Sequence, residues 1–151
     1  MENYQRILVP YDGSKFSEKA LKEAIKIAKK FDSDLFILTV IDASSVSIPK
    51  TKKGVMLDVK KFARTLKNHT AKLDLKLRDE VLRCKEDGVS ADYELVMGKP
   101  AEIILKFAKK REINLIAMGI QGLTGFGRLK AIGSISRRIS EQASCPVLLV
   151  H

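Results

Sequence analysis

Short apolar runs alternate with helical patterns along this chain, and the alternation constrains the fold more than any other feature of the sequence. The run at residues 34–41 is apolar at nearly every position, which is typical of a strand covered on both faces in a parallel sheet. Strands that alternate with helices predict right-handed crossovers and a parallel sheet with helices on both faces. The expected strands are 6–11, 34–41, 91–97, 113–118 and 146–150, and the expected helices are 17–30, 56–87, 100–111 and 134–143.

The size and composition of the chain suit one α/β domain. Its 151 residues, 45% of them hydrophobic, are enough to bury a core, and we expect a single domain over residues 1–151. No apolar stretch approaches the roughly 18 residues that a membrane-spanning helix needs, and the first residues lack a signal-peptide pattern. We therefore expect a cytoplasmic protein. Cys84 and Cys145 have no Cys-x-x-Cys spacing and are interpreted as small buried hydrophobic residues.

The formal net charge of +10 is concentrated in one segment. Residues 50–85 hold twelve Lys and Arg against four acidic residues, a net of +8. Such a segment fits either a solvated lysine-rich helix face or a contact with an acidic partner, and we favour the solvated face. Phe62 is its only aromatic residue and falls on the apolar stripe, so any nucleic-acid binding is expected to be weak and nonspecific.

The basic segment contains the longest helical pattern in the chain. Apolar residues recur at spacings of three and four from Met56 to Cys84, which predicts one helix over 56–87 that ends near Gly88. At 1.5 Å per residue such a helix is roughly 45 Å long, so part of it is expected to protrude. The preceding residues 42–54 are polar and irregular, and they predict a mobile loop.

Glycines directly after the expected fourth strand indicate a ligand site. Gly119-Ile-Gln-Gly122 is followed, after ten intervening residues, by Gly133-Ser134 at the start of a helix. Glycines let the backbone approach a ligand closely, and the free N–H groups of a helix start suit phosphate. The Lys-Ser/Thr pair of a P-loop does not follow these glycines. Ligands of such sheets bind beyond the carboxyl ends of the strands, so Asp12-Gly13-Ser14 joins the site if the first and fourth strands are neighbours.

Landmarks along the whole chain resemble those of the universal stress protein family. They are the opening Ile7-Leu-Val-Pro-Tyr-Asp-Gly-Ser14, the strand end Thr39-Val40, the turn Gly98-Lys-Pro100, the Met118-Gly119 loop, the Gly133-Ser134 pair and the ending Cys145-Pro-Val-Leu-Leu-Val150. The resemblance implies an open five-stranded parallel sheet in the order 3-2-1-4-5, which makes the first and fourth strands neighbours. The ATP-binding branch of the family has a similar glycine pattern, with one residue fewer between its second glycine and the Gly-Ser or Gly-Thr pair.

The resemblance also implies ATP, with Mg²⁺, as the ligand and assigns its contacts. Pro10, Tyr11 and Asp12 would lie at the end of the first strand, with Asp12 near the ribose, the phosphates or the metal ion. Val40 would touch the adenine. The other implied contacts are Met118 and Gly119 at the base and ribose, Gly122 at the ribose and phosphates, and Gly133, Ser134 and Ile135 at the phosphates.

Several of these residues also have a purely structural interpretation. Asp12 could cap the first helix or stabilise the turn before it. Gly119 and Gly122 could be ordinary turn glycines, and Ser134 could be the N-cap of the last helix. The sequence alone leaves these alternatives open.

Binding with a regulatory output, in a stress response, is favoured over catalysis. Hydrolysis of ATP needs a general base to activate water. Asp12 is the only carboxylate near the expected site, and a metal ion would occupy it, so we expect slow ATP hydrolysis at most. A phosphoacceptor domain is disfavoured because the first strand lacks a second acidic residue beside Asp12. The alternative function is a nucleotide-free scaffolding module that acts through its dimer surface or through helix 56–87. In the strand order that the resemblance implies, residues 146–150 form an apolar edge strand, which is normally covered or paired. The resemblance implies that this strand pairs with its copy in a homodimer.

Overall fold

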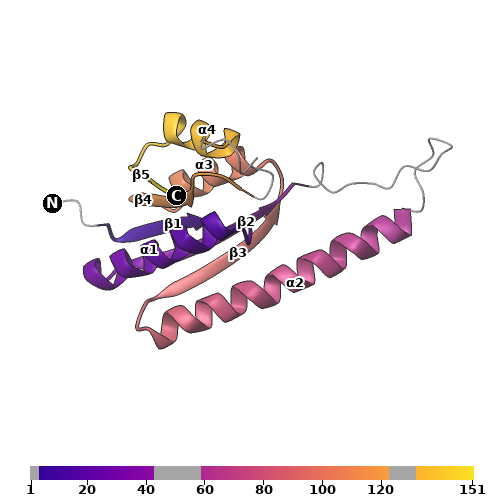
Figure 1. Ribbon diagram of the computed structural model, residues 1–151, viewed down its shortest axis with the longest axis horizontal. Helices are drawn as coiled ribbons and strands as arrows, with labels where there is room; N and C mark the ends of the chain where they lie inside the picture. The colour runs from indigo at the N-terminus through magenta and orange to yellow at the C-terminus, as the bar shows by residue number, and fades with distance from the viewer. Residues whose placement is uncertain (1–3, 43–58, 123–131) are drawn as a thin grey trace.

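The strands form one parallel sheet in the order expected from the family resemblance. The computed structural model describes residues 4–42, 59–122 and 132–151. Within them, five strands lie in the order β3-β2-β1-β4-β5 (Figure 1). The elements are β1 (Arg6–Pro10), α1 (Lys15–Phe31), β2 (Asp34–Ile41), α2 (Val59–Glu86), β3 (Ala91–Met97), α3 (Pro100–Lys110), β4 (Leu115–Gly119), α4 (Ser134–Gln142) and β5 (Val147–Val150).

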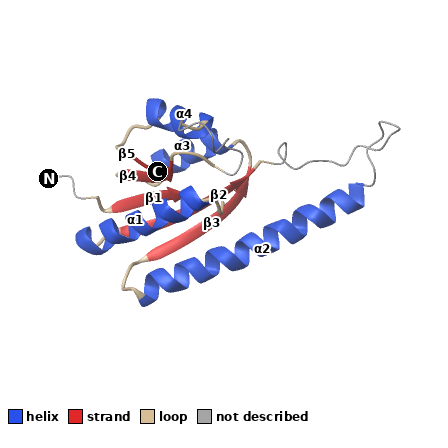
Figure 2. Cartoon of the chain, viewed as in Figure 1, coloured by secondary structure: helices blue, strands red, loops and turns tan. Residues whose placement is uncertain are grey.

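Helices cover both faces of the sheet, as the apolar runs predict (Figure 2). Alternate residues of β1 enter two different cores. Ile7 and Val9 belong to the core that includes residues of α1 and α2, whereas Leu8 belongs to the core that includes residues of α3 and α4. Successive side chains of a strand point to opposite faces, so a strand buried on both sides must be apolar throughout.

Several element boundaries differ by one or two residues from those predicted by the apolar patterns, and three of the starts have a clear physical reason. α1 begins at Lys15 rather than 17, because the Ser14 side chain caps it by accepting the N–H of Ser17. β4 begins at Leu115 rather than 113, since the chain first turns through Glu112, whose φ is 51°. β5 begins one residue after Pro146, which has no N–H to give to a strand ladder.

The two halves of α2 have different environments. Its 28 residues span about 42 Å, and Figure 1 shows its N-terminal half running beyond the sheet, as the length of the pattern predicts. Leu77, Val81 and Cys84 of the C-terminal half are buried, whereas Phe62 and Leu66 are only half-buried. The predicted helix residues 56–58 and the predicted loop residues 43–54 lie outside the described residues. Among the described residues, no helix combines the length and the apolar character that crossing a bilayer requires.

The two cysteines are not equally buried. Cys84 is fully buried, as expected, and burial raises the pKa of its thiol to about 11. Cys145 is half-buried beside β5, and burial raises the pKa of its thiol as well. Both thiols are therefore protonated and weakly reactive at neutral pH.

Candidate functional site

The turns that follow β1 and β4 meet at the carboxyl edge of the sheet. The two strands are hydrogen-bonded neighbours, with Ile7 opposite Leu115. A Cβ at Gly122 would lie only 2.7 Å from Oδ2 of Asp12, so the carboxylate of one turn sits against the backbone of the other. This edge is also where the crossovers from β1 and β4 diverge, the place at which open parallel sheets bind ligands.

Asp12 stabilises its own turn and does not cap α1. Its Oδ1 accepts the N–H of Ser14 at 2.9 Å, and Gly13 between them has a φ of 81°. The N-cap of α1 is Ser14, whose Oγ accepts the N–H of Ser17 at 3.1 Å. Of the two structural interpretations of Asp12, the turn is confirmed and the cap is wrong. The hydrogen bond from Ser14 holds the carboxylate in place beside Gly122.

Tyr11 belongs to the core between the sheet and the helices α1 and α2. Its side chain is 2% exposed and clusters with Leu21 and Leu77. Its carbonyl accepts the hydroxyl of Thr39 at 2.6 Å. Burial raises the pKa of the phenol, and the nearby Lys76 ammonium opposes that rise. The Tyr11 ring is therefore part of the core beneath the turn, and only its backbone faces the site.

Gly119 has a packing requirement that sequence reasoning did not identify. A Cβ at this position would lie 2.5 Å from Cβ of Phe16 and 2.8 Å from its carbonyl carbon. Because one of these atoms is backbone, the first turn of α1 would have to move to admit any side chain. The glycine lets the end of β4 pack directly against α1, whatever further role it has toward a ligand.

The start of α4 is joined to the end of β4. Gly133 is the N-cap, so the alternative that Ser134 caps this helix is wrong; Ser134 is the first residue of the helix and is exposed. The Gly133 N–H donates to the Ile120 carbonyl at 2.8 Å. Ser136, which the sequence analysis did not single out, is buried and donates its hydroxyl to the Gly119 carbonyl at 2.9 Å. The sequence feature that could have identified Ser136 is its position as the third residue of a helix that follows a glycine turn.

No side chain among the described residues caps α4. The first N–H groups of a helix have no partner within the helix, and together with its dipole they favour an anion. Ile135 in this turn is 39% exposed. The loop between Gly122 and Gly133, including the one-residue excess over the family pattern, lies outside the described residues except for Ile132.

Apolar residues border the site on the face covered by α3 and α4. Met118, at 5% exposure, and the half-buried Val40 belong to the same core cluster. Pro10, the last residue of β1, is also half-buried. Val40 on β2 and Met118 on β4 thus provide an apolar border next to the polar turns.

Within the described ranges no group of three His, Cys, Asp or Glu side chains could hold a metal ion. A Mg²⁺ ion prefers octahedral oxygen coordination, and it is commonly held by one carboxylate together with substrate phosphates and water. Asp12 fits that role, because it can supply one carboxylate to an ion whose other ligands would come from a phosphate compound and water. A single carboxylate suits a Mg²⁺ ion that enters the site already bound to phosphate.

The fold is that of an open, doubly wound α/β protein whose strand order reverses between β1 and β4, the place where such sheets bind ligands. Residues 3–151 match the universal stress protein family. The chain is 35% identical over 148 residues to a universal stress protein of Methanocaldococcus jannaschii, with 97% of this chain and 82% of that one covered. The chain therefore belongs to the universal stress protein family.

Solved structures of this family share the fold. The universal stress protein UspA from Lactobacillus plantarum matches with a TM-score of 0.82 and 26% identity, and the match covers 100% of both chains. A universal stress protein in complex with cAMP matches with a TM-score of 0.69 and 24% identity, over 99% of this chain and 98% of that one. At that identity the second likeness concerns the fold alone.

Proposed function

We propose that this protein binds ATP, together with Mg²⁺, between the Asp12 turn and the start of α4, and that binding has a regulatory output in a stress response. The observation that carries the proposal is the Asp12 carboxylate held 2.7 Å from the position of a Gly122 Cβ, at the switch point of the sheet. A carboxylate facing polyphosphate is favourable only through a bridging cation, which explains the choice of a magnesium complex.

The surroundings of Asp12 supply complementary chemistry for the rest of a nucleotide. The N–H groups at the start of α4 suit phosphate oxygens. Val40 and Met118 offer an apolar border for the adenine. The backbone between the phosphate region and the adenine region is formed by the ends of β1 and β4, at Pro10, Tyr11, Gly119 and Gly122. Gly133, Ser134 and Ile135 are the proposed phosphate contacts.

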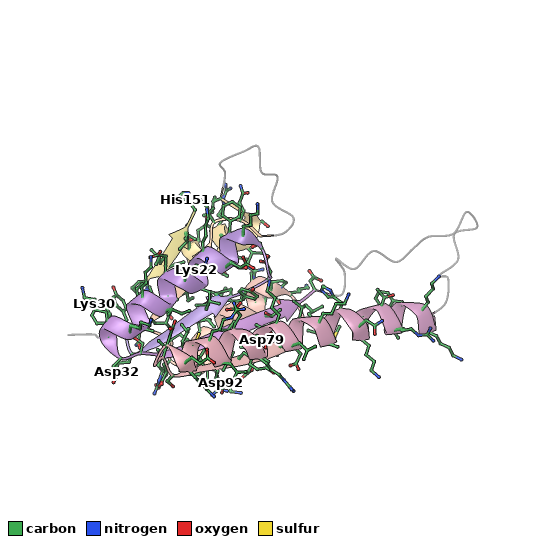
Figure 3. All side chains as sticks on the ribbon, turned by 60° about the horizontal axis from the view of Figure 1, so that its bottom comes forward. Lys22, Lys30, Asp32, Asp79, Asp92 and His151 are labelled. Atoms are coloured by element: carbon green, nitrogen blue, oxygen red, sulfur yellow. The ribbon has the colours of Figure 1, made fainter. Side chains whose placement is uncertain are left out.

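The test compares ATP affinity in nucleotide-stripped wild type, Asp12→Asn and Asp92→Asn, with Mg²⁺ and with a chelator. Asp92 is a matched control because its Oδ1 also accepts a backbone N–H, that of Tyr93 at 2.9 Å, and it lies at the amino end of β3 (Figure 3). Asn at position 12 keeps the acceptor for Ser14 but removes the charge. We expect Asp12→Asn to weaken binding about tenfold with Mg²⁺ and little without it. Equal affinities for the two variants with Mg²⁺ would refute the metal role of Asp12.

A homodimer through β5 is part of the proposal. β5 is an edge strand, and its Leu148 is 36% exposed. An exposed apolar edge is normally paired or covered. We expect a dimer by light scattering and a monomer after Leu148→Lys. Met97→Lys, at the opposite edge strand β3 and 53% exposed in the wild type, should leave the dimer intact. A dimer that survives Leu148→Lys would contradict the pairing.

A nucleotide-free scaffolding function has two observations in its favour, both of them on α2. Leu75 and Leu82 lie seven residues apart on α2 and are 62% and 57% exposed. Side chains along the N-terminal half of α2 stand clear of the sheet (Figure 3). Co-purification separates the two candidates, because adenine nucleotide released from denatured protein supports the ATP proposal and its absence favours the scaffold.

A further inference from the structure

Lys76 of α2 reaches the turn that carries Asp12. Its Nζ lies 3.0 Å from Oε1 of Glu18 on α1 and 5.5 Å from the ring centroid of Tyr11. A Cβ at Gly13 would lie 3.9 Å from the same Nζ. One ammonium group thus adjoins the end of β1, the turn after it and the beginning of α1.

The charge states of these groups suit one another. Contacts with Tyr11 and Glu18 raise the pKa of Lys76, so the side chain is a cation at neutral pH. The Tyr11 phenol is neutral, and a cation within about 6 Å of an aromatic centroid is attracted to the ring face. The side chains of Lys76 and Glu18 are 43% and 45% exposed, and an ion pair so exposed adds little to stability. We therefore expect the Lys76–Glu18 ion pair to affect the position of the turn at residues 11–14 more than the stability of the fold.

The turn beside Lys76 is the one that orients the carboxylate. Gly13 has a φ of 81°, a conformation that side chains rarely adopt, and Lys76 lies in the space next to it. Asp12 precedes this glycine, and Ser14, which donates to the carboxylate, follows it. A shift of Gly13 would therefore move both members of that hydrogen bond relative to Gly122.

We propose that Lys76 is a positioning residue: from α2 it holds the turn of residues 11–14 so that the Asp12 carboxylate faces Gly122. The effect on ligand affinity rests on the proposed ATP function, whereas the effect on the turn does not. Lys76 also connects the ligand site to the long basic helix.

The test compares Lys76→Met, Glu18→Gln and Lys72→Met. Lys72 is the matched control, since it is an exposed lysine one helical turn earlier on α2. The first measurement is hydrogen exchange of the Ser14 amide, the donor to Asp12, in ligand-free protein. The second is the ATP dissociation constant with Mg²⁺.

We expect Lys76→Met to speed exchange at Ser14 about fivefold and to weaken ATP binding by a similar factor. Glu18→Gln should act in the same direction and Lys72→Met should leave both values unchanged. Exchange at Ser14 that is the same in Lys76→Met and Lys72→Met overturns the positioning role. So does weaker ATP binding in Lys76→Met with unchanged binding in Glu18→Gln, which indicates direct contact between Lys76 and phosphate. If the wild type binds no ATP, the proposed function fails while the exchange comparison still decides the role of Lys76.

Discussion

Helices α1 and α4 begin at the same edge of the sheet, and their first turns are built in opposite ways. α1 is closed by side chains: Ser14 accepts the Ser17 N–H, and the Ser17 hydroxyl donates back to the Ser14 carbonyl at 2.9 Å. Glu18 adds an acidic residue to the first turn. α4 has Gly133 at its N-cap, with no side-chain cap from the residues that the structure describes and no acidic residue in its first turn.

The difference assigns separate tasks to the two helix starts. At a capped helix start with an acidic residue, the protein itself satisfies a free N–H group and offsets part of the helix dipole. An uncapped start without an acidic residue retains both for an anion from outside. We therefore infer that the capped start of α1 keeps Asp12 in position and propose that the start of α4 receives phosphate. The predictions below test this division, beginning with the largest expected effect.

Gly119→Val should cost the most stability, because its Cβ meets backbone and side-chain atoms of Phe16 at the start of α1. Overpacking against backbone is expected to lower the free energy of unfolding by about 3 kcal/mol. Urea denaturation of the purified variant measures the change. Gly133→Ala at the start of α4 is the matched control, since its Cβ would lie 3.3 Å from the Ile120 carbonyl oxygen, and it should cost less than about 1 kcal/mol. Equal losses would remove the distinction between the two starts.

Gly122→Val should affect binding more than stability, because its Cβ meets the end of the Asp12 side chain, which can move aside. Displacing the carboxylate should weaken ATP–Mg²⁺ binding by about 2 kcal/mol, a roughly 30-fold rise in Kd. A double-mutant cycle sharpens the test. In an Asp12→Ala background, Gly122→Val should lose much less affinity, since the carboxylate it displaces is already gone. Additive losses would mean that Gly122 acts independently of Asp12.

The smallest expected effect is a difference in stability between Ser14→Ala, at the start of α1, and Ser134→Ala, at the start of α4. Removing the Ser14 cap should lower the free energy of unfolding by about 1 kcal/mol. Ser134 is exposed and makes no cap, so Ser134→Ala should change stability by less than about 0.5 kcal/mol. Parallel thermal melts of the ligand-free proteins give both values. A stability loss at Ser134 that matches the loss at Ser14 would contradict the open start of α4.

The fold was predictable because its signals are local. Continuous apolar runs such as 34–41 predict strands buried on both faces, and the helical spacing of apolar residues predicts α1 and the long α2. The adjacency of β1 and β4 came from the family resemblance, since periodicity carries no strand order. The start of α1 was missed because the Ser14 side chain caps the helix two residues before the predicted start. The start of α4 at Ser134 was predicted, but Ser and Gly are both acceptable N-caps, so the sequence did not show that Gly133 takes this position.

The candidate site was predictable as a set of turns, and its contacts were not. Asp12 and Gly122 are far apart in sequence, and only the folded chain shows that they meet. The packing of Gly119 on Phe16, the hydrogen bond from Ser136 to Gly119 and the reach of Lys76 to Glu18 also depend on how helices dock on the sheet. No short motif encodes such distances, because each joins residues from two separately formed elements.

Calorimetric titration of nucleotide-stripped, folded wild type with ATP and Mg²⁺ tests the central claim most directly. The account predicts a saturable heat and a rise in the melting temperature, since a ligand that binds only the folded state stabilises it. No heat and no thermal stabilisation at millimolar ATP would contradict the account.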